Sequence, residues 1–181
     1  MSPRVDVSRP IQRSVLVSWD ADAAYRRFTA EFGQWWPRFA LSVGGDRVRQ
    51  VVFENRVGGR IYEEHHDGTR FHWGTVTALE PPHRVAFDWH STRTPADAQQ
   101  VEVLFQAVPG GTKVELISRG WEKMAKKVQG DYKAYDGAWG AALQVYAKRA
   151  SLTMALFNVM SALMTASGQR GAMIRNVEGR M

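Results

Sequence analysis

The stretch of residues 130–150 constrains the fold of this 181-residue chain most, because its large apolar residues recur at helical spacing. Separations of three or four positions collect them on one side of a helix with 3.6 residues per turn. These residues are Tyr132, Tyr135, Trp139, Leu143 and Tyr146. Such a helix requires a concave apolar surface beneath it, and a buried tyrosine hydroxyl needs a hydrogen-bond partner.

The residues before this helix predict an antiparallel sheet that can supply the concave surface. Apolar and polar residues alternate in short segments, the pattern of strands buried on one face. The expected strands cover residues 9–19, 49–54, 60–66, 71–79, 85–89, 101–106 and 112–118. Turn sequences such as Asp67-Gly68 and Pro109-Gly110-Gly111 separate them. We therefore expect six or seven strands curved around the long helix.

A shorter helix is expected after the first strand. Asp20 or Asp22 can cap it, and it should run to about Phe32, with Gly33 as a stop signal. The following Trp35-Trp36-Pro37 biases Trp36 away from helix. Since adjacent indoles must point in different directions, we expect one to pack inward and the other to cover an opening or the first helix.

Composition indicates an ordinary globular domain, with 44% hydrophobic and 23% charged residues. The absence of cysteine excludes disulfides, thiolate nucleophiles and cysteine-ligated metals. No segment predicts a signal peptide or a membrane span, so we expect a cytoplasmic protein. The net charge is +6, but the group Lys123, Lys126 and Lys127 is interpreted as solvated surface, so nucleic-acid binding is not predicted.

The last residues differ in character from the predicted domain of residues 1–150. Residues 151–165 carry apolar residues on two sides of a helix and would need burial on both. These residues are Leu152, Met154, Leu156, Phe157, Val159, Leu163 and Met164. We predict a helical extension and basic tail over residues 151–181, with a homodimer formed through 151–165; packing across the same domain is the alternative, and membrane-surface binding a lesser one.

Several motifs, taken in order, resemble those of the SRPBCC (START-like, helix-grip) superfamily, and within it the homologues of the activator of the heat-shock-protein-90 ATPase. The motifs are Trp35-Trp36-Pro37, Val57-Gly58-Gly59-Arg60, Trp73-Gly74-Thr75-Val76, Pro81-Pro82-His83-Arg84-Val85, Trp89, Gly111-Thr112-Lys113-Val114, Gly120-Trp121 and Gly137-Ala138-Trp139. The resemblance implies an α+β helix-grip fold: a curved antiparallel sheet wrapped around a long C-terminal helix, with one or two short helices after the first strand. It also implies a cavity between helix and sheet. That superfamily includes lipid and hormone carriers, polyketide cyclases and aromatases, and co-chaperone domains.

The candidate ligand-binding residues are those expected to face the cavity. They are Trp35, Phe53, Tyr62, Glu64, His72, Trp73, Phe87, Trp89, Phe105, Tyr132, Tyr135 and Trp139. The alternative is that the aromatic residues simply fill the core. Strand alternation leaves two choices open: either Tyr62 and Glu64 face the cavity or Ile61, Glu63 and His65 do, and either His72 or Trp73 does.

Metal binding by the run Glu63-Glu64-His65-His66-Asp67 is not predicted, because consecutive strand residues point to opposite faces. No cofactor motif and no nucleophile–base pair is recognised. The leading hypothesis is a non-enzymatic carrier or sensor that binds a hydrophobic small molecule in a cavity of about 300 Å³ or more. The alternatives are a cyclase or aromatase that moves protons with a cavity Glu, His72 or a tyrosine, and a chaperone-related or self-associating interaction module.

Overall fold

The computed structural model describes residues 6–91, 94–123 and 131–148. Within them, seven strands form one antiparallel sheet in the order β1-β7-β6-β5-β4-β3-β2. The strands are β1 Ile11–Val17, β2 Val48–Phe53, β3 Arg60–His65, β4 Arg70–Glu80, β5 Arg84–Trp89, β6 Gln99–Val108 and β7 Gly111–Arg119. The predicted sheet of six or seven strands is confirmed.

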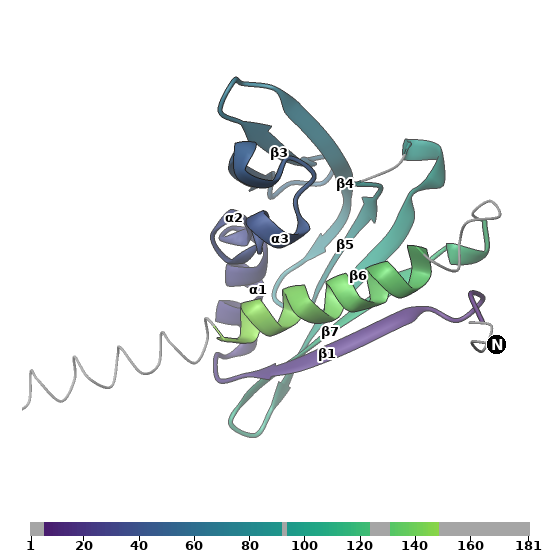
Figure 1. Cartoon of the computed structure of the whole chain (residues 1–181). Coiled ribbons are helices and arrows are strands. Elements are labelled where there is room, and N and C mark those ends of the chain that lie inside the picture. Colours follow the sequence, from purple (N-terminus) through teal and green to yellow (C-terminus); the bar gives the residue numbers. More distant parts are fainter. Residues whose placement is uncertain (1–5, 92–93, 124–130, 149–181) are drawn as a thin grey trace, which may run out of the picture.

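The long helix, residues 131–148, lies across the hollow side of the curved sheet (Figure 1). Three short helices lie near one end of this long helix. The short helices are α1 Ala21–Thr29, α2 Phe32–Trp35 and α3 Arg38–Leu41. This arrangement confirms the α+β helix-grip fold, with three short helices after β1 where one or two were expected.

Helix α1 begins after Asp20, whose side chain accepts a hydrogen bond from a first-turn N–H at 2.7 Å, as the capping signal predicted. The predicted helix end at Phe32, followed by a stop at Gly33, is wrong: α1 ends at Thr29 and Gly33 lies inside α2. A Cβ on Gly33 would lie 2.1 Å from the carbonyl oxygen of Val51. Glycine is needed there for the close approach of α2 to β2, and not to end a helix.

The apolar stripe of the long helix is confirmed, because Trp139, Leu143 and Tyr146 are buried. Tyr146 meets the hydroxyl requirement, since its Oη donates to the Ala24 carbonyl oxygen at 2.8 Å. Burial raises the pKa of the Tyr146 hydroxyl far above its ordinary value, so this group remains a hydrogen-bond donor at neutral pH. Tyr146 therefore ties the long helix to α1.

Strand β3 resolves the first of the two choices that alternation left open. Ile61, Glu63 and His65 point to the core side and are buried. Tyr62 and Glu64 point to the opposite side of the sheet. The ionisable group on the core side is therefore Glu63, with His65, and not Glu64.

Strand β4 resolves the second choice through an irregularity. Ile61 pairs with Gly74 and Tyr62 pairs with His72, so Trp73 is the extra residue of a β-bulge. Trp73 is fully buried, whereas His72 is exposed. The bulge thus delivers the indole of Trp73 to the core.

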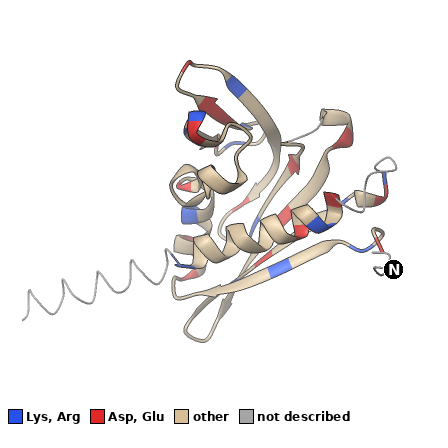
Figure 2. Cartoon of the chain, viewed as in Figure 1, with Lys and Arg blue, Asp and Glu red and all other residues tan. Residues whose placement is uncertain are grey.

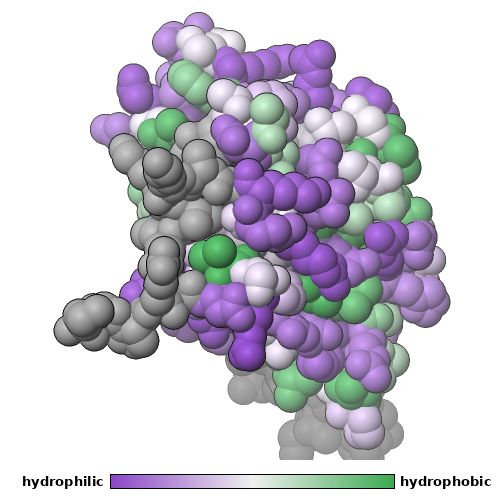
Figure 3. All heavy atoms as spheres, turned by 90° about the vertical axis from the view of Figure 1, so that its right-hand side faces the viewer, coloured by the Kyte–Doolittle hydropathy of each residue, from purple (hydrophilic) through white to green (hydrophobic). Residues whose placement is uncertain are grey.

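The surface is mixed in character. Acidic and basic residues are interspersed over the sheet and the helices (Figure 2). The side of the molecule seen in Figure 3 is largely hydrophilic, with small separate groups of hydrophobic residues. Where the structure describes the chain, no helix is long and apolar enough to cross a membrane.

Candidate functional site

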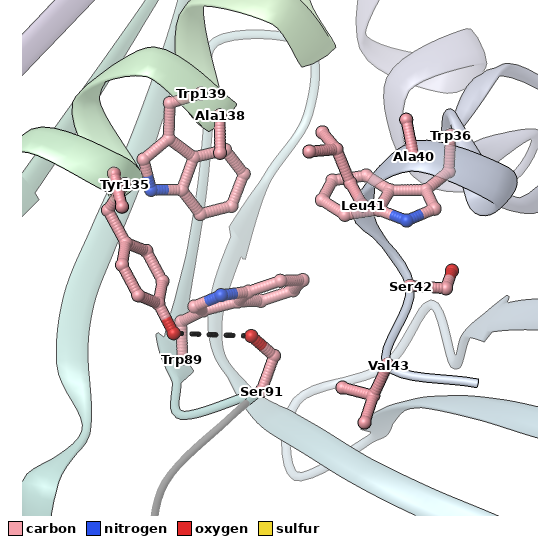
Figure 4. Close-up of a pocket in the computed structure, with 11 residues that line it drawn as sticks. Trp36, Ala40, Leu41, Ser42, Val43, Trp89, Ser91, Tyr135, Ala138 and Trp139 are labelled. Carbon is pink, nitrogen blue, oxygen red and sulfur yellow. Dashed lines mark hydrogen bonds between the residues drawn. The ribbon is translucent and has the colours of Figure 1, made fainter. Parts of the chain in front are cut away.

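A pocket of about 280 Å³ lies beside the long helix (Figure 4). Three parts of the chain surround it: the long helix, the end of β5 with Ser91 just beyond it, and the segment from Trp36 through α3 to the loop after it. Its lining residues are Trp36, Ala40, Leu41, Ser42, Val43, Trp89, Ser91, Ala134, Tyr135, Ala138 and Trp139. None of these eleven carries a charge, so the pocket is apolar with a few hydroxyl groups.

Three indoles, Trp36, Trp89 and Trp139, come together from distant parts of the sequence; we call them the indole triad. The ring centroid of Trp89 lies 5.5 Å from that of Trp36 and 5.0 Å from that of Trp139. The Trp36 and Trp139 centroids are 6.1 Å apart. These separations are typical of favourable aromatic pairs, so the triad is a rigid apolar surface.

Small residues of the long helix leave room beside the triad. Ala134 and Ala138 are four positions apart and therefore lie on the same side of the helix, next to Tyr135. The hydroxyl groups of Tyr135 and Ser91 are 3.3 Å apart and form a hydrogen bond (Figure 4). This hydroxyl pair is the polar feature that the helix and β5 offer at the pocket.

Ser42 and Val43 of the loop after α3 form part of the opposite wall; we call residues 42–44 of this loop the wall segment. The N–H groups of Val43 and Gly44 donate to the carboxylate of Glu63 at 2.9 and 2.8 Å. Oε1 of Glu63 also lies 2.7 Å from Nε2 of His65. Glu63 itself does not line the pocket, but it binds Val43, which does, and the adjacent Gly44.

Three polar atoms of lining residues are buried without a hydrogen-bond partner among the residues described: Nε1 of Trp36, Nε1 of Trp139 and Oγ of Ser42. Unpaired buried polar groups are uncommon in folded proteins and carry a free-energy cost. Such atoms also occur away from the pocket, for example Nε1 of Trp19 and Oη of Tyr25, so these three do not by themselves mark a binding site.

Three of the twelve predicted ligand-binding residues line the pocket: Trp89, Tyr135 and Trp139. Trp73 lies directly behind it, with its ring centroid 5.4 Å from those of both Trp36 and Trp89. Tyr132 lies outside the lining and packs on Trp121 at 5.5 Å.

Four other predicted residues, Trp35, Phe53, Phe87 and Phe105, belong to the packed core, as the core-filling alternative anticipated. The remaining three, Tyr62, Glu64 and His72, do not face the core. Glu64 forms ion pairs with Arg49 and Arg70 on the other side of the sheet. His72 contacts the carbonyl oxygen of Gly74 at 2.6 Å and makes no contribution to the pocket.

The prediction missed Trp36, Ser91, the segment 40–43 and the two alanines of the long helix. One signal was available: Ala134 and Ala138 stand at helical spacing beside Tyr135 and Trp139, and small residues in an aromatic face leave space. No comparable signal marked the segment 40–43, which has neither strand alternation nor a long helical stripe.

The described parts of the chain contain no group of three or more His, Asp or Glu side chains arranged to hold a metal ion. The acidic and histidine-rich run in β3 is divided between the two faces of the sheet, as strand geometry requires.

Comparison with known proteins identifies relatives of this architecture. Residues 20–147 match the family described as "Activator of Hsp90 ATPase homolog 1-like protein". A search of curated proteins gave no match.

Solved structures resemble the chain over most of its length. A protein from Nitrosomonas europaea is 12% identical, with a TM-score of 0.58 over 83% of this chain and 99% of that one. The Aha1 dimer from Colwellia psychrerythraea is 16% identical, with a TM-score of 0.55 over 76% of this chain and 92% of that one. These two likenesses concern the fold alone. An anthrahydroquino-γ-pyrone synthase is 29% identical, with a TM-score of 0.56 over 82% of this chain and 99% of that one.

Proposed function

Because the chain belongs to the family of activator of Hsp90 ATPase homolog 1-like proteins, we propose that it binds a hydrophobic small molecule beside the indole triad, as a non-enzymatic carrier or sensor. The observation that carries the proposal is an apolar pocket of about 280 Å³ bordered by three indole rings. Ligand pockets commonly measure ~300–1,000 Å³, so this pocket lies just below that range and below the expected volume, and it suits a small ligand.

The lining also favours an uncharged ligand. No lining residue is acidic or basic, and moving an unpaired charge out of water into such a site costs several kcal/mol or more. Flat rings suit the faces and edges of the indole triad. One polar group of the ligand can be accommodated at the hydroxyl pair of Tyr135 and Ser91.

Titration with 1-naphthol, an uncharged two-ring probe, tests the proposal through the fluorescence of the pocket tryptophans. We expect saturable binding of one probe per chain. The variant Ala138→Phe places a ring in the pocket and should weaken binding by at least about tenfold, a loss of ~1.4 kcal/mol.

The matched control is Ala141→Phe, because Ala141 is exposed on the same helix and lies outside the pocket. Equal affinity of the two variants, or no saturation with the native protein, would contradict the proposal. Native mass spectrometry of the purified protein adds a search for a small molecule that co-purifies.

A cyclase- or aromatase-type proton transfer is the second candidate. It is supported by the phenolic hydroxyl of Tyr135 at the pocket and by the 29% identity to an anthrahydroquino-γ-pyrone synthase. In this role Tyr135 would give a proton to, or take one from, an oxygen of the bound ring system. Turnover of a candidate polyketide by the native protein and by Tyr135→Phe is the test; an unchanged rate in the variant removes this candidate.

Self-association is our proposal for a protein partner. The predicted dimerisation segment, residues 151–165, lies outside the residues that the structure describes. A protein of the same fold from C. psychrerythraea is described as a dimer, which supports the proposal. Sedimentation should give a larger mass per particle for the full chain than for a chain ending at Ala150, beyond the difference in length; identical oligomeric states would count against it.

A further inference from the structure

The wall segment, residues 42–44, is tied to the sheet by a carboxylate that does not itself touch the pocket. We propose that Glu63, oriented by His65, is a positioning residue that fixes the wall segment and thereby limits the pocket to small ligands. The proposal rests on the proposed ligand binding for its consequence, but its structural half can be tested without a ligand.

The contacts of Glu63 account for both of its oxygens. Oε2 accepts from the Val43 N–H at 2.9 Å, and Oε1 accepts from the Gly44 N–H at 2.8 Å. A carboxylate can only accept, so the ring nitrogen of His65, 2.7 Å from Oε1, is the third donor. Three donors on a side chain that is 0% exposed compensate for the cost of removing it from water.

Packing leaves the wall segment little freedom at Gly44. A Cβ on Gly44 would lie 2.1 Å from Nε2 of His65 and 2.9 Å from Cγ2 of Val48. The backbone of the segment is therefore seated directly on the imidazole that orients Glu63. The ring of His65 is supported in turn by Phe71, with ring centroids 4.7 Å apart.

Within the described residues, the other hydrogen bonds of the wall segment are to residues close by in the sequence. The Ser42 N–H donates to the Arg38 carbonyl oxygen at 3.2 Å, and the Gly44 carbonyl oxygen accepts from Arg47. The Ser42 hydroxyl has no partner in the described part of the chain, and Val43 is 47% exposed. Glu63 thus provides the hydrogen bonds that connect this segment to the sheet.

The position of the segment decides how large the pocket is. Ser42 and Val43 both line it, across from the helix residues Ala138 and Trp139 (Figure 4). If the hydrogen bonds to Glu63 are lost, the loop can move outward while the sheet and helix stay in place. The pocket would then accept larger ligands and hold small ones less firmly.

The neighbouring residue supplies a matched control. Glu64 is also buried, at 3% exposure, and lies on the same strand. It faces the other side of the sheet, where it pairs with Arg49 and Arg70 and makes no hydrogen bond to the wall segment. Substitution of Glu64 therefore tests for the general effect of altering a buried glutamate in β3.

The experiment compares Glu63→Gln with Glu64→Gln in the full chain. Glutamine keeps the size of the side chain but offers one acceptor oxygen for two backbone N–H groups. We expect amide hydrogen exchange at Val43 and Gly44 to become about fivefold faster or more in Glu63→Gln, the effect of one lost hydrogen bond. Exchange at these amides in Glu64→Gln should match the native protein.

Binding of two probes gives the second readout. The ratio of affinities for 1-naphthol and the larger 1-hydroxypyrene should fall by about fivefold in Glu63→Gln and stay constant in Glu64→Gln. Gly44→Ala provides an independent variant, because it keeps the carboxylate but forces His65 and the loop apart; it should change the ratio in the same direction. If Glu63→Gln does not fold, this variant decides the question.

The outcomes separate the two proposals. Faster exchange at Val43 and Gly44 with no probe bound by the native protein would support the positioning role of Glu63 and reject the ligand-binding function. Probe binding by the native protein with unchanged exchange and an unchanged affinity ratio in Glu63→Gln would overturn the positioning role. Equal changes in both glutamate variants would also overturn it.

Discussion

Near α1, the long helix packs Tyr146 against Phe28 and Trp35, with ring centroids 5.5 and 5.3 Å apart. Further along the same helix, Trp139 packs against Trp89 at 5.0 Å, an equally close contact. Yet the first region is filled, whereas the second borders a pocket of about 280 Å³. Aromatic residues therefore do not decide whether the space between helix and sheet is closed.

The difference between the two regions lies in what surrounds the rings. In the filled region, which we call the closed region, the helix supplies the large side chains of Leu143 and Tyr146, and α1 and α2 face them. In the region beside the pocket, which we call the open region, the helix supplies Ala134 and Ala138, and the cover is α3 with the irregular loop after it. Small helix residues beneath an irregular cover leave the space that regular helices would fill.

Truncating a ring in the closed region should have the largest effect on stability. Phe28 is fully buried and its ring contacts Phe32, Trp35, Phe105 and Tyr146. Phe28→Ala should lower the free energy of unfolding by about 3–5 kcal/mol, measured by urea denaturation. Leu41 is a half-buried residue of the pocket wall, so Leu41→Ala should lower the free energy of unfolding by less than about 2 kcal/mol. Similar losses in the two variants would show that the regions do not differ in packing.

Two alanines one helical turn apart provide a sharper comparison. Ala142 is buried in the core, whereas Ala138 borders the pocket. Ala142→Leu should destabilise the protein by about 1–3 kcal/mol through overpacking. Ala138→Leu has room for its side chain and should change stability by less than about 0.5 kcal/mol while reducing 1-naphthol binding. Thermal and urea denaturation measure both; a larger loss in Ala138→Leu would refute the assignment of the open region.

Removal of one hydroxyl in the closed region should have a smaller effect than either substitution in the packed core, Phe28→Ala or Ala142→Leu. Tyr146→Phe deletes the hydrogen bond to the Ala24 carbonyl oxygen and should cost about 1 kcal/mol at neutral pH, measured by urea denaturation. Burial raises the pKa of Tyr146 in the folded state above its unfolded value of about 10. Stability linked to this group is therefore complete below about pH 10 and is lost as the pH rises further.

The difference in stability between native protein and Tyr146→Phe should accordingly narrow as the pH rises above about 10, and it should be measured from about pH 9 to pH 11. The variant retains every other tyrosine and so serves as the control for their ionisation. A constant difference over this range would mean that Tyr146 ionises as easily in the folded state as in the unfolded one.

Periodicity was sufficient to predict the sheet and the stripe of the long helix, because burial on one face imposes a repeat on the sequence. It also reduced the inward side of β3 to two alternatives. It could not choose between them, since β3 has glutamate at both 63 and 64 and each is buried. The β-bulge at Trp73 likewise could not be predicted from the alternation of apolar and polar residues in β4.

The pocket was harder to predict than the core. Trp35 and Trp36 are adjacent and chemically identical, and both are buried; Trp36 lines the pocket while Trp35 packs against Phe28. Which of the two faces the open region depends on how α2 and α3 lie on the sheet. Long-range contacts determine that arrangement, and no local pattern encodes it.

The location of the irregular cover has a consequence for engineering and for divergence between relatives. Residues 40–43 contribute four of the eleven lining positions but belong to no strand pair of the sheet. Exchanging this tetrapeptide would redraw one side of the binding site without altering any strand register. A library confined to these four codons is therefore an economical way to obtain new ligand preferences on an unchanged scaffold.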